Sequence, residues 1–294
     1  MELGVVIPHT GPSASREFVR EICTLADTTG LDALWAVDHL VMPYHVESPY
    51  VLGRRPSPVA DGAVAQLLAP NFEMLTTLAW VAGFTDRIAL GTSISVLPMR
   101  NAVANARQLA TLDELSGGRV RFGVGVGWLR EEVEALGMPW ANRGRRSEEH
   151  IALLRHLWCA EGDVVEFHGE FHDIPPIHPE PRPRQRPIPI YIGGHSDAAI
   201  ERAGRIGDGW IAAPMSPPRV AEHWTRVRAA AERAGRDPGA LALVVAEAPQ
   251  PGRSRAELVV DYAEVGVTHL QVRVDGDLNV ARDEIHELAT INLG

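Results

Sequence analysis

The chain has 294 residues, 45% of them hydrophobic and 22% charged, with a formal net charge of -10 at pH 7. This is the composition of an ordinary globular protein, and its negative charge argues against a general nucleic-acid or membrane role. Lysine is absent. This excludes Schiff-base aldolases, pyridoxal-phosphate enzymes and Walker-type P-loops, because all of them need a lysine amine.

The N-terminal residues do not resemble an export signal, since Glu2 precedes only a short apolar run. No apolar stretch approaches the roughly 18 residues of a membrane span. The two cysteines form no CxxC pair, zinc-ligand spacing or disulfide framework. We therefore expect a cytoplasmic protein.

Short β-branched runs alternate with longer helical patterns along the chain. The patterns predict strands at residues 3–7, 33–36, 88–93, 120–124, 190–192, 209–213, 241–246 and 269–272. They predict helices at residues 15–29, 72–84, 102–115, 129–136, 146–159, 196–204, 218–234 and 255–265. Eight strands in alternation with helices indicate a (β/α)8 TIM barrel, a single domain over residues 1–294. A Rossmann fold is disfavoured, because no G-x-G-x-x-G follows the first strand.

Two segments are insertions beyond the strands and helices that a minimal barrel needs. One is the insertion after strand 2, residues 41–70, which is rich in proline, glycine and polar residues and has no sustained period. The other lies before strand 5. It combines VVEFHGEFHD, a predicted hairpin with Gly169-Glu170 as a two-residue turn, with the proline-rich IPPIHPEPRPRQRPIP.

The second strand ends in the ionisable pair Asp38-His39. Because the active site of such a barrel lies at the C-terminal ends of its strands, we expect the pair at the barrel mouth. One side chain would hydrogen-bond the barrel wall while the other faces a ligand. The alternative is a structural pair that only caps the strand end.

Small residues follow the third and fourth strands. Thr92, Ser93 and Ser95 stand where larger side chains are usual, which would let a flat ring approach the backbone or would simply form a bulge. Gly125 and Gly127 follow in VRFGVGVGW, where backbone amides would meet a ligand or form a plain turn.

The fifth strand ends in Gly193-Gly194, and Ser196 or Asp197 can cap the helix that follows. Close backbone approach and a helix N-terminus together suit a phosphate, although a tight turn with an N-cap would explain the same residues. No HxH, HExxH or carboxylate cluster appears at a strand end, so no metal is expected.

Taken together, these strand ends resemble the bacterial luciferase-like monooxygenase superfamily, and within it the branch that uses the deazaflavin coenzyme F420. The motifs are LWAVDHLVMP, IALGTSISVLP, LDELSGGRVRFGVGVGWLREEVEALG, IPIYIGGHS and GDGW, in the family's order over about residues 1 to 270.

The resemblance implies a flavin or deazaflavin at the C-terminal face of the barrel. It implies that Ser93-Ile94 forms a bulge with a non-proline cis peptide behind the ring. It further implies that Gly125-Val126-Gly127 lines the ring and ribityl chain and that Gly193-Gly194-His195 binds the phosphate. Asp38 belongs to the same cofactor site, and His39 lies near the reacting face.

The function implied is hydride transfer between coenzyme F420 and a small organic substrate, with His39 as proton donor or acceptor and a homodimer as the assembly. Trp128 stands where the sugar-phosphate dehydrogenases of the superfamily have glutamate. This argues against that activity and suggests an apolar wall for the substrate. Arg100, Arg130 or Arg184 would meet the poly-glutamate tail of the cofactor.

Two other functions remain open at this point. One is an FMNH2-dependent monooxygenase, because FMN needs the same bulge and phosphate loop. The other is a non-catalytic flavin-binding barrel. The substrate itself is not readable from the insertion at residues 41–70.

Overall fold

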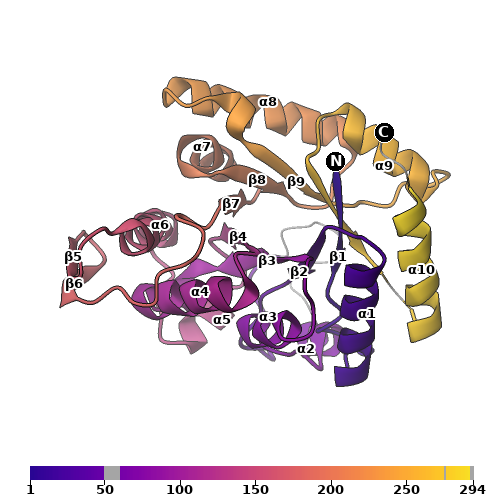
Figure 1. Ribbon diagram of the computed structural model, residues 1–294, viewed down its shortest axis with the longest axis horizontal. Coiled ribbons are helices and arrows are strands. Elements are labelled where there is room, and N and C mark those ends of the chain that lie inside the picture. The colour runs from indigo at the N-terminus through magenta and orange to yellow at the C-terminus, as the bar shows by residue number, and fades with distance from the viewer. Residues whose placement is uncertain (50–59, 275, 292–294) are drawn as a thin grey trace.

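A closed barrel of eight parallel strands forms the centre of the computed structural model, which describes residues 1–49, 60–274 and 276–291 (Figure 1). The strands follow one another around the barrel in the order β1-β10-β9-β8-β7-β4-β3-β2. Their bounds are β1 Glu2–Val6, β2 Ala33–Ala36, β3 Ala89–Val96, β4 Val120–Gly125, β7 Ile190–Gly193, β8 Gly209–Ala212, β9 Ala242–Ala246 and β10 His269–Arg273. The predicted (β/α)8 barrel is confirmed.

Helices cover the outside of the barrel. They are α1 Arg16–Thr28, α2 Ala63–Leu68, α3 Met74–Ala82, α4 Ala102–Ser116, α5 Arg130–Ala135, α6 Arg143–Cys159, α7 Asp197–Ile206, α8 Pro217–Arg233, α9 Arg255–Glu264 and α10 Leu278–Thr290. Two 3-10 turns, η1 Leu97–Met99 and η2 Pro238–Ala240, complete the set. A large apolar cluster joins the outward faces of the strands to these helices. No helix within the described ranges is long and apolar enough to span a membrane.

A second, smaller apolar cluster fills the inside of the barrel, and Trp35 of β2 is its largest member. Glycines on the neighbouring strands make room for the indole. A Cβ atom on Gly91 would lie 2.2 Å from the Trp35 ring, and one on Gly4 would lie 2.6 Å from its Nε1. The lower barrel is therefore a packed core, so a ligand has room only towards the mouth.

The insertion after β2 packs on the loop that follows β4. Val46 and Val64 are buried against Leu129, with Trp128 half-buried beside them. The insertion includes α2, which the sequence analysis did not predict. Residues 50–59 of this insertion lie outside the described residues.

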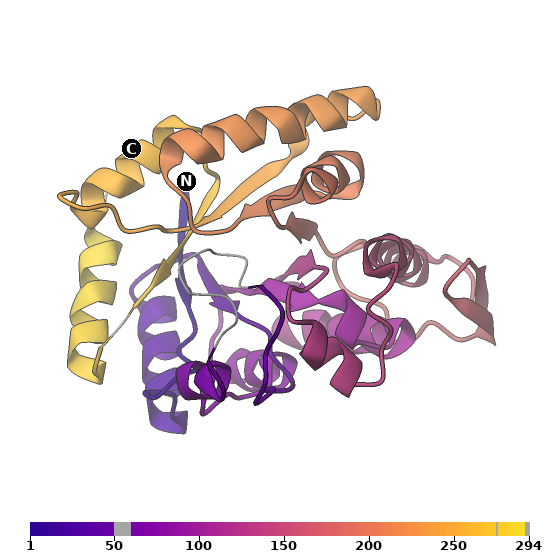
Figure 2. The same ribbon diagram turned by 180° about the vertical axis from the view of Figure 1, so that it is seen from behind.

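The second insertion holds the antiparallel hairpin of β5 Val165–His168 and β6 Asp173–Ile177, which lies beyond α6 as seen from the barrel (Figures 1 and 2). The predicted two-residue turn is wrong. His168 pairs with Asp173, so four residues form the loop. The Glu149 carboxylate of α6 explains the wider loop, because it accepts hydrogen bonds from the amides of residues 170, 171 and 172.

Candidate active site

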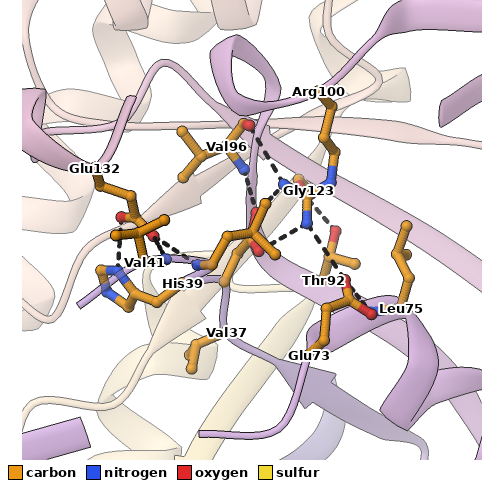
Figure 3. A network of polar contacts seen from close by, with 12 residues as sticks. Val37, His39, Val41, Glu73, Leu75, Thr92, Val96, Arg100, Gly123 and Glu132 are labelled. Atoms are coloured by element: carbon orange, nitrogen blue, oxygen red, sulfur yellow. Dashed lines mark hydrogen bonds and ion pairs between the residues drawn. The ribbon is translucent and has the colours of Figure 1, made fainter. Parts of the chain in front are cut away.

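Asp38 and His39 directly follow β2, and their side chains diverge as expected. The Asp38 carboxylate is fully buried and accepts hydrogen bonds from Arg100 at 2.5 and 2.8 Å and from the Val96 amide at 2.8 Å (Figure 3). Burial raises the pKa of Asp38, and Arg100 opposes this rise. Asp38 therefore ties β2 to the end of β3, and its oxygens face the barrel wall.

Arg100 is itself buried and also lies 3.6 Å from Glu73 at the start of α3. It is therefore not available for the tail of a cofactor, contrary to the expectation above. Arg130 is exposed and pairs with Glu134. Arg184 pairs with Glu114 and lies against Gly118, which precedes β4, so it belongs to the face opposite the mouth.

His39 points away from Asp38, toward α5. Its Nδ1 lies 2.9 Å from Oε2 of Glu132, whose side chain is only 3% exposed (Figure 3). The other Glu132 oxygen accepts hydrogen bonds from the amides of Leu40 and Val41 at 2.6 and 3.0 Å. Because an ionised carboxylate only accepts, this contact places a proton on Nδ1 of His39. Nε2 forms no hydrogen bond with the residues that the structure describes.

Sequence reasoning placed Glu131 and Glu132 on a helix but assigned them no contact. Both lie in the first turn of α5 and bind the insertion after β2. Glu131 accepts hydrogen bonds from Ser48 Oγ and from the amides of Glu47 and Ser48. Burial works against its ionisation, but these hydrogen bonds prevail and lower the pKa of Glu131. The sequence did carry a signal for this role, because the acidic pair Glu131-Glu132 follows closely after the glycines of the fourth strand.

His9 is a second residue that sequence reasoning missed. It lies fully buried after β1, with Nδ1 2.9 Å from the Ile7 carbonyl oxygen and Nε2 3.0 Å from that of Val37. Burial lowers its pKa. The imidazole thus fixes the backbone that leads into Asp38 and His39.

The third strand carries the predicted bulge. Its pairing with β4 shifts register between Thr92 and Ser95, and the Ser93-Ile94 peptide is cis. The Thr92 hydroxyl donates to the Gly123 carbonyl at 2.6 Å, and Ser93 Oγ donates to Gln271 on β10 at 2.7 Å.

Ile94 brings three of the predicted residues together. A Cβ atom on Gly125 would lie 1.9 Å from Ile94 Cδ1, and one on Gly193 would lie 2.8 Å from Ile94 Cγ2. The isoleucine therefore lies over two glycines on neighbouring strands. The three residues form an apolar surface at the strand ends, which we call the floor.

Beside the floor, Val126 and Gly127 are half-buried, and Gly127 has a φ of +73° that favours glycine. Trp128 packs with the insertion after β2. The side chain predicted as a substrate wall is therefore half-buried under that insertion.

The β7–α7 turn joins a glycine in the left-handed region to a capped helix N-terminus. Gly194 has a φ of +114°, and its carbonyl oxygen accepts a hydrogen bond from Trp210 Nε1 at 2.7 Å. Ser196 caps α7 by accepting from the Ala199 amide at 3.3 Å, and His195 is exposed. The first amides of a helix lack intrahelical acceptors, so this end offers donors to a bound anion.

Within residues 1–49, 60–274 and 276–291, no group of three or more histidine, cysteine, aspartate or glutamate side chains could hold a metal ion. His168, on the hairpin, pairs with Asp173, and His172 lies against His150 instead.

A family model described as luciferase-like monooxygenase matches residues 1–290. The chain belongs to this family. An uncharacterized protein of Mycobacterium tuberculosis is 35% identical over 222 residues, 74% of this chain and 73% of that protein. The phthiodiolone/phenolphthiodiolone dimycocerosates ketoreductase of the same organism is 29% identical over 269 residues, 88% of this chain and 67% of that protein.

Solved structures share the fold over the whole chain. An F420-dependent secondary alcohol dehydrogenase in complex with an F420-acetone adduct matches with a TM-score of 0.76 at 16% identity, covering 99% of this chain and 98% of that one. Monooxygenase RslO1 from Streptomyces bottropensis matches with a TM-score of 0.74 at 21% identity, covering 100% and 99%. Identities this low establish the fold alone.

Proposed function

We propose that the protein transfers a hydride between coenzyme F420 and a small organic substrate, with His39 as the proton donor or acceptor. The observation that carries the proposal is the His39–Glu132 pair beside the glycine-backed floor. Membership of the luciferase-like family supports an oxidoreductase. The ketoreductase relative and the F420-dependent alcohol dehydrogenase fold both favour a carbonyl or alcohol as the substrate group.

The residues at the mouth fit a tricyclic ring that ends in a phosphate chain. Ile94, Gly125 and Gly193 offer an apolar surface that a Cβ atom on either glycine would disturb. The Gly193-Gly194 turn, His195 and the start of α7 would hold the phosphate. Val126 and Gly127 would line the chain between them. When bound, the deazaflavin gives or takes the hydride.

His39 would move the proton that accompanies the hydride. Its Nδ1–H donates to Glu132, which leaves Nε2 to exchange a proton with the substrate oxygen. Glu132 then stabilises the imidazolium that forms when Nε2 accepts that proton. Asp38 would contribute indirectly, because its carboxylate holds Arg100 and the end of β3 in place.

An FMNH2-dependent monooxygenase is the second candidate. The full-length fold match to monooxygenase RslO1 favours it. The same floor and β7–α7 turn would take FMN, which has no poly-glutamate tail. The two proposals therefore differ in which cofactor binds more tightly.

Replacing the imidazole tests the assignment of His39. We expect His39→Ala to bind F420 as the wild type does but to lose roughly a hundred- to ten-thousand-fold in turnover on a panel of alcohols and ketones. His168→Ala is the matched control, because His168 is an exposed hairpin histidine outside the mouth. Undiminished turnover of His39→Ala would remove His39 from the mechanism.

A further inference from the structure

Gln271 is a buried polar residue inside the barrel that no residue pattern pointed to. It lies on β10 and is only 2% exposed. Its neighbours Leu270 and Val272 belong to the apolar cluster outside the barrel. Because side chains alternate along a strand, Gln271 points into the barrel.

The Gln271 amide has one satisfied atom and one unsatisfied atom. Ser93 Oγ donates to Oε1 at 2.7 Å, so the contact joins β3 to β10. Nε2 is buried and has no hydrogen-bond partner in the described part of the chain. In the structure Oε1 faces the Ser93 hydroxyl, so the group without a partner is the NH2 donor.

A buried donor without an acceptor is unfavourable, and native proteins leave few of them. This donor lies beside Ser93, which precedes Ile94 of the floor. A ligand that rests on the floor would bring its own acceptors to it. The deazaflavin and flavin rings both carry carbonyl oxygens on one ring edge.

We propose that Gln271 Nε2 donates a hydrogen bond to a ring carbonyl oxygen of the bound cofactor, and that Ser93 is a positioning residue that orients the amide. The inference rests on the proposed function, because it needs the ring to lie on the floor. It assigns Ser93 an indirect role, through Gln271, in place of direct contact with the ring.

The test compares cofactor affinity with the stability of the cofactor-free protein. Gln271→Met keeps the size of the side chain but removes the donor, and Ser93→Ala/Gln271→Met removes both partners. We expect either variant to bind F420 and FMN roughly three- to tenfold more weakly, with a shifted absorption band of the bound ring. Ser93→Ala alone should show a smaller loss.

The melting temperature of the cofactor-free double variant should not fall, because removing both partners of a buried hydrogen bond together is nearly neutral. A purely structural glutamine would leave the affinities for F420 and FMN and the absorption of the bound ring unchanged in both variants. Gln185→Met is the control, since Gln185 is bonded to Asp113 and to the Val120 carbonyl at the start of β4. It should lower stability without changing either affinity.

Two failures remain distinguishable. If the wild type binds neither cofactor, the proposed function fails. If the wild type binds F420 or FMN and Gln271→Met binds it equally well with an unchanged spectrum, only the role of Gln271 is overturned.

Discussion

The proton on His39 is fixed by one carboxylate that comes from another part of the chain. Glu132 is 93 positions away in sequence and accepts from Nδ1 at 2.9 Å while also holding the Leu40 and Val41 amides. Orientation and tautomer of the imidazole are therefore set by the same group. At the residue scale, Glu132 is the positioning partner of His39.

A neutral side chain of similar size at position 132 tests how much the negative charge of Glu132 contributes. Glu132→Gln removes the charge that would stabilise the imidazolium, and its single oxygen cannot accept from both Nδ1 of His39 and the Leu40 and Val41 amides. We expect cofactor affinity to be retained and turnover to fall roughly tenfold, the equivalent of about 1.4 kcal/mol. Glu134→Gln, on the exposed side of the same helix, should have no effect. Equal turnover of Glu132→Gln and the wild type would contradict the assignment.

The Asp38–Arg100 ion pair predicts a strong dependence of folding stability on Arg100. Both side chains are buried, and Asp38 has no other cationic partner among the described residues. Arg100→Met leaves a buried carboxylate with a single amide donor, so the free energy of unfolding should fall by roughly 3–5 kcal/mol.

The exposed Arg130–Glu134 pair is the comparison, and Arg130→Met should cost less than about 1 kcal/mol. Urea denaturation of the two variants measures both values. Similar losses would show that the buried pair does not anchor the end of β2.

At the scale of elements, the residue patterns predict where each barrel strand lies. Residues 33–36 match β2 in full. The predicted strand at 88–93 corresponds to β3 at Ala89–Val96, which continues past the predicted end because pairing with β4 resumes after the bulge. The position of Ser93-Ile94 followed from a family resemblance, and its cofactor role stays a prediction.

Contacts between distant segments are what the patterns could not predict. Glu149 of α6 widens the hairpin loop, and Glu132 meets His39 from another element. Both carboxylates looked like ordinary charges on a helix. The residues of α10 do show a helical spacing, at Ala281, Ile285 and Leu288, although no helix was predicted there.

The contact between α6 and the hairpin predicts a pH-dependent stability. His150 of α6 is 2% exposed and lies against His172 of the hairpin loop. Burial, together with the nearby His172 and Arg100, lowers the pKa of His150 to about 3. The unfolded chain has the ordinary histidine pKa of 6.5. As the pH falls through this range, the unfolded state takes up a proton that the folded state does not, so stability is lost.

We expect this residue to contribute up to about 1.4 kcal/mol of lost stability per pH unit below pH 6.5. Thermal unfolding of the wild type and of His150→Leu across the range measures the difference in slope. His286→Leu, an exposed position on α10, should keep the wild-type slope. An unchanged slope for His150→Leu would refute the prediction.

At the scale of the whole molecule, the residues that pack the barrel core and the residues of the candidate site lie in different parts of the barrel. Trp35 and its glycine neighbours fill the lower interior, and His39 and the floor lie at the ends of four strands, β2, β3, β4 and β7. The same architecture serves F420-dependent and monooxygenase relatives, so the fold does not choose the cofactor. The homodimer expected from the resemblance stays a prediction for sedimentation analysis.

Titration of the purified protein with F420 and with FMN, followed by cofactor fluorescence, tests the central proposal most directly. We expect saturable binding of both rings, with the dissociation constant for F420 at least roughly tenfold lower than that for FMN. Tighter binding of FMN would contradict the deazaflavin assignment and favour the monooxygenase, and no binding of either ring would contradict a redox cofactor at the barrel mouth.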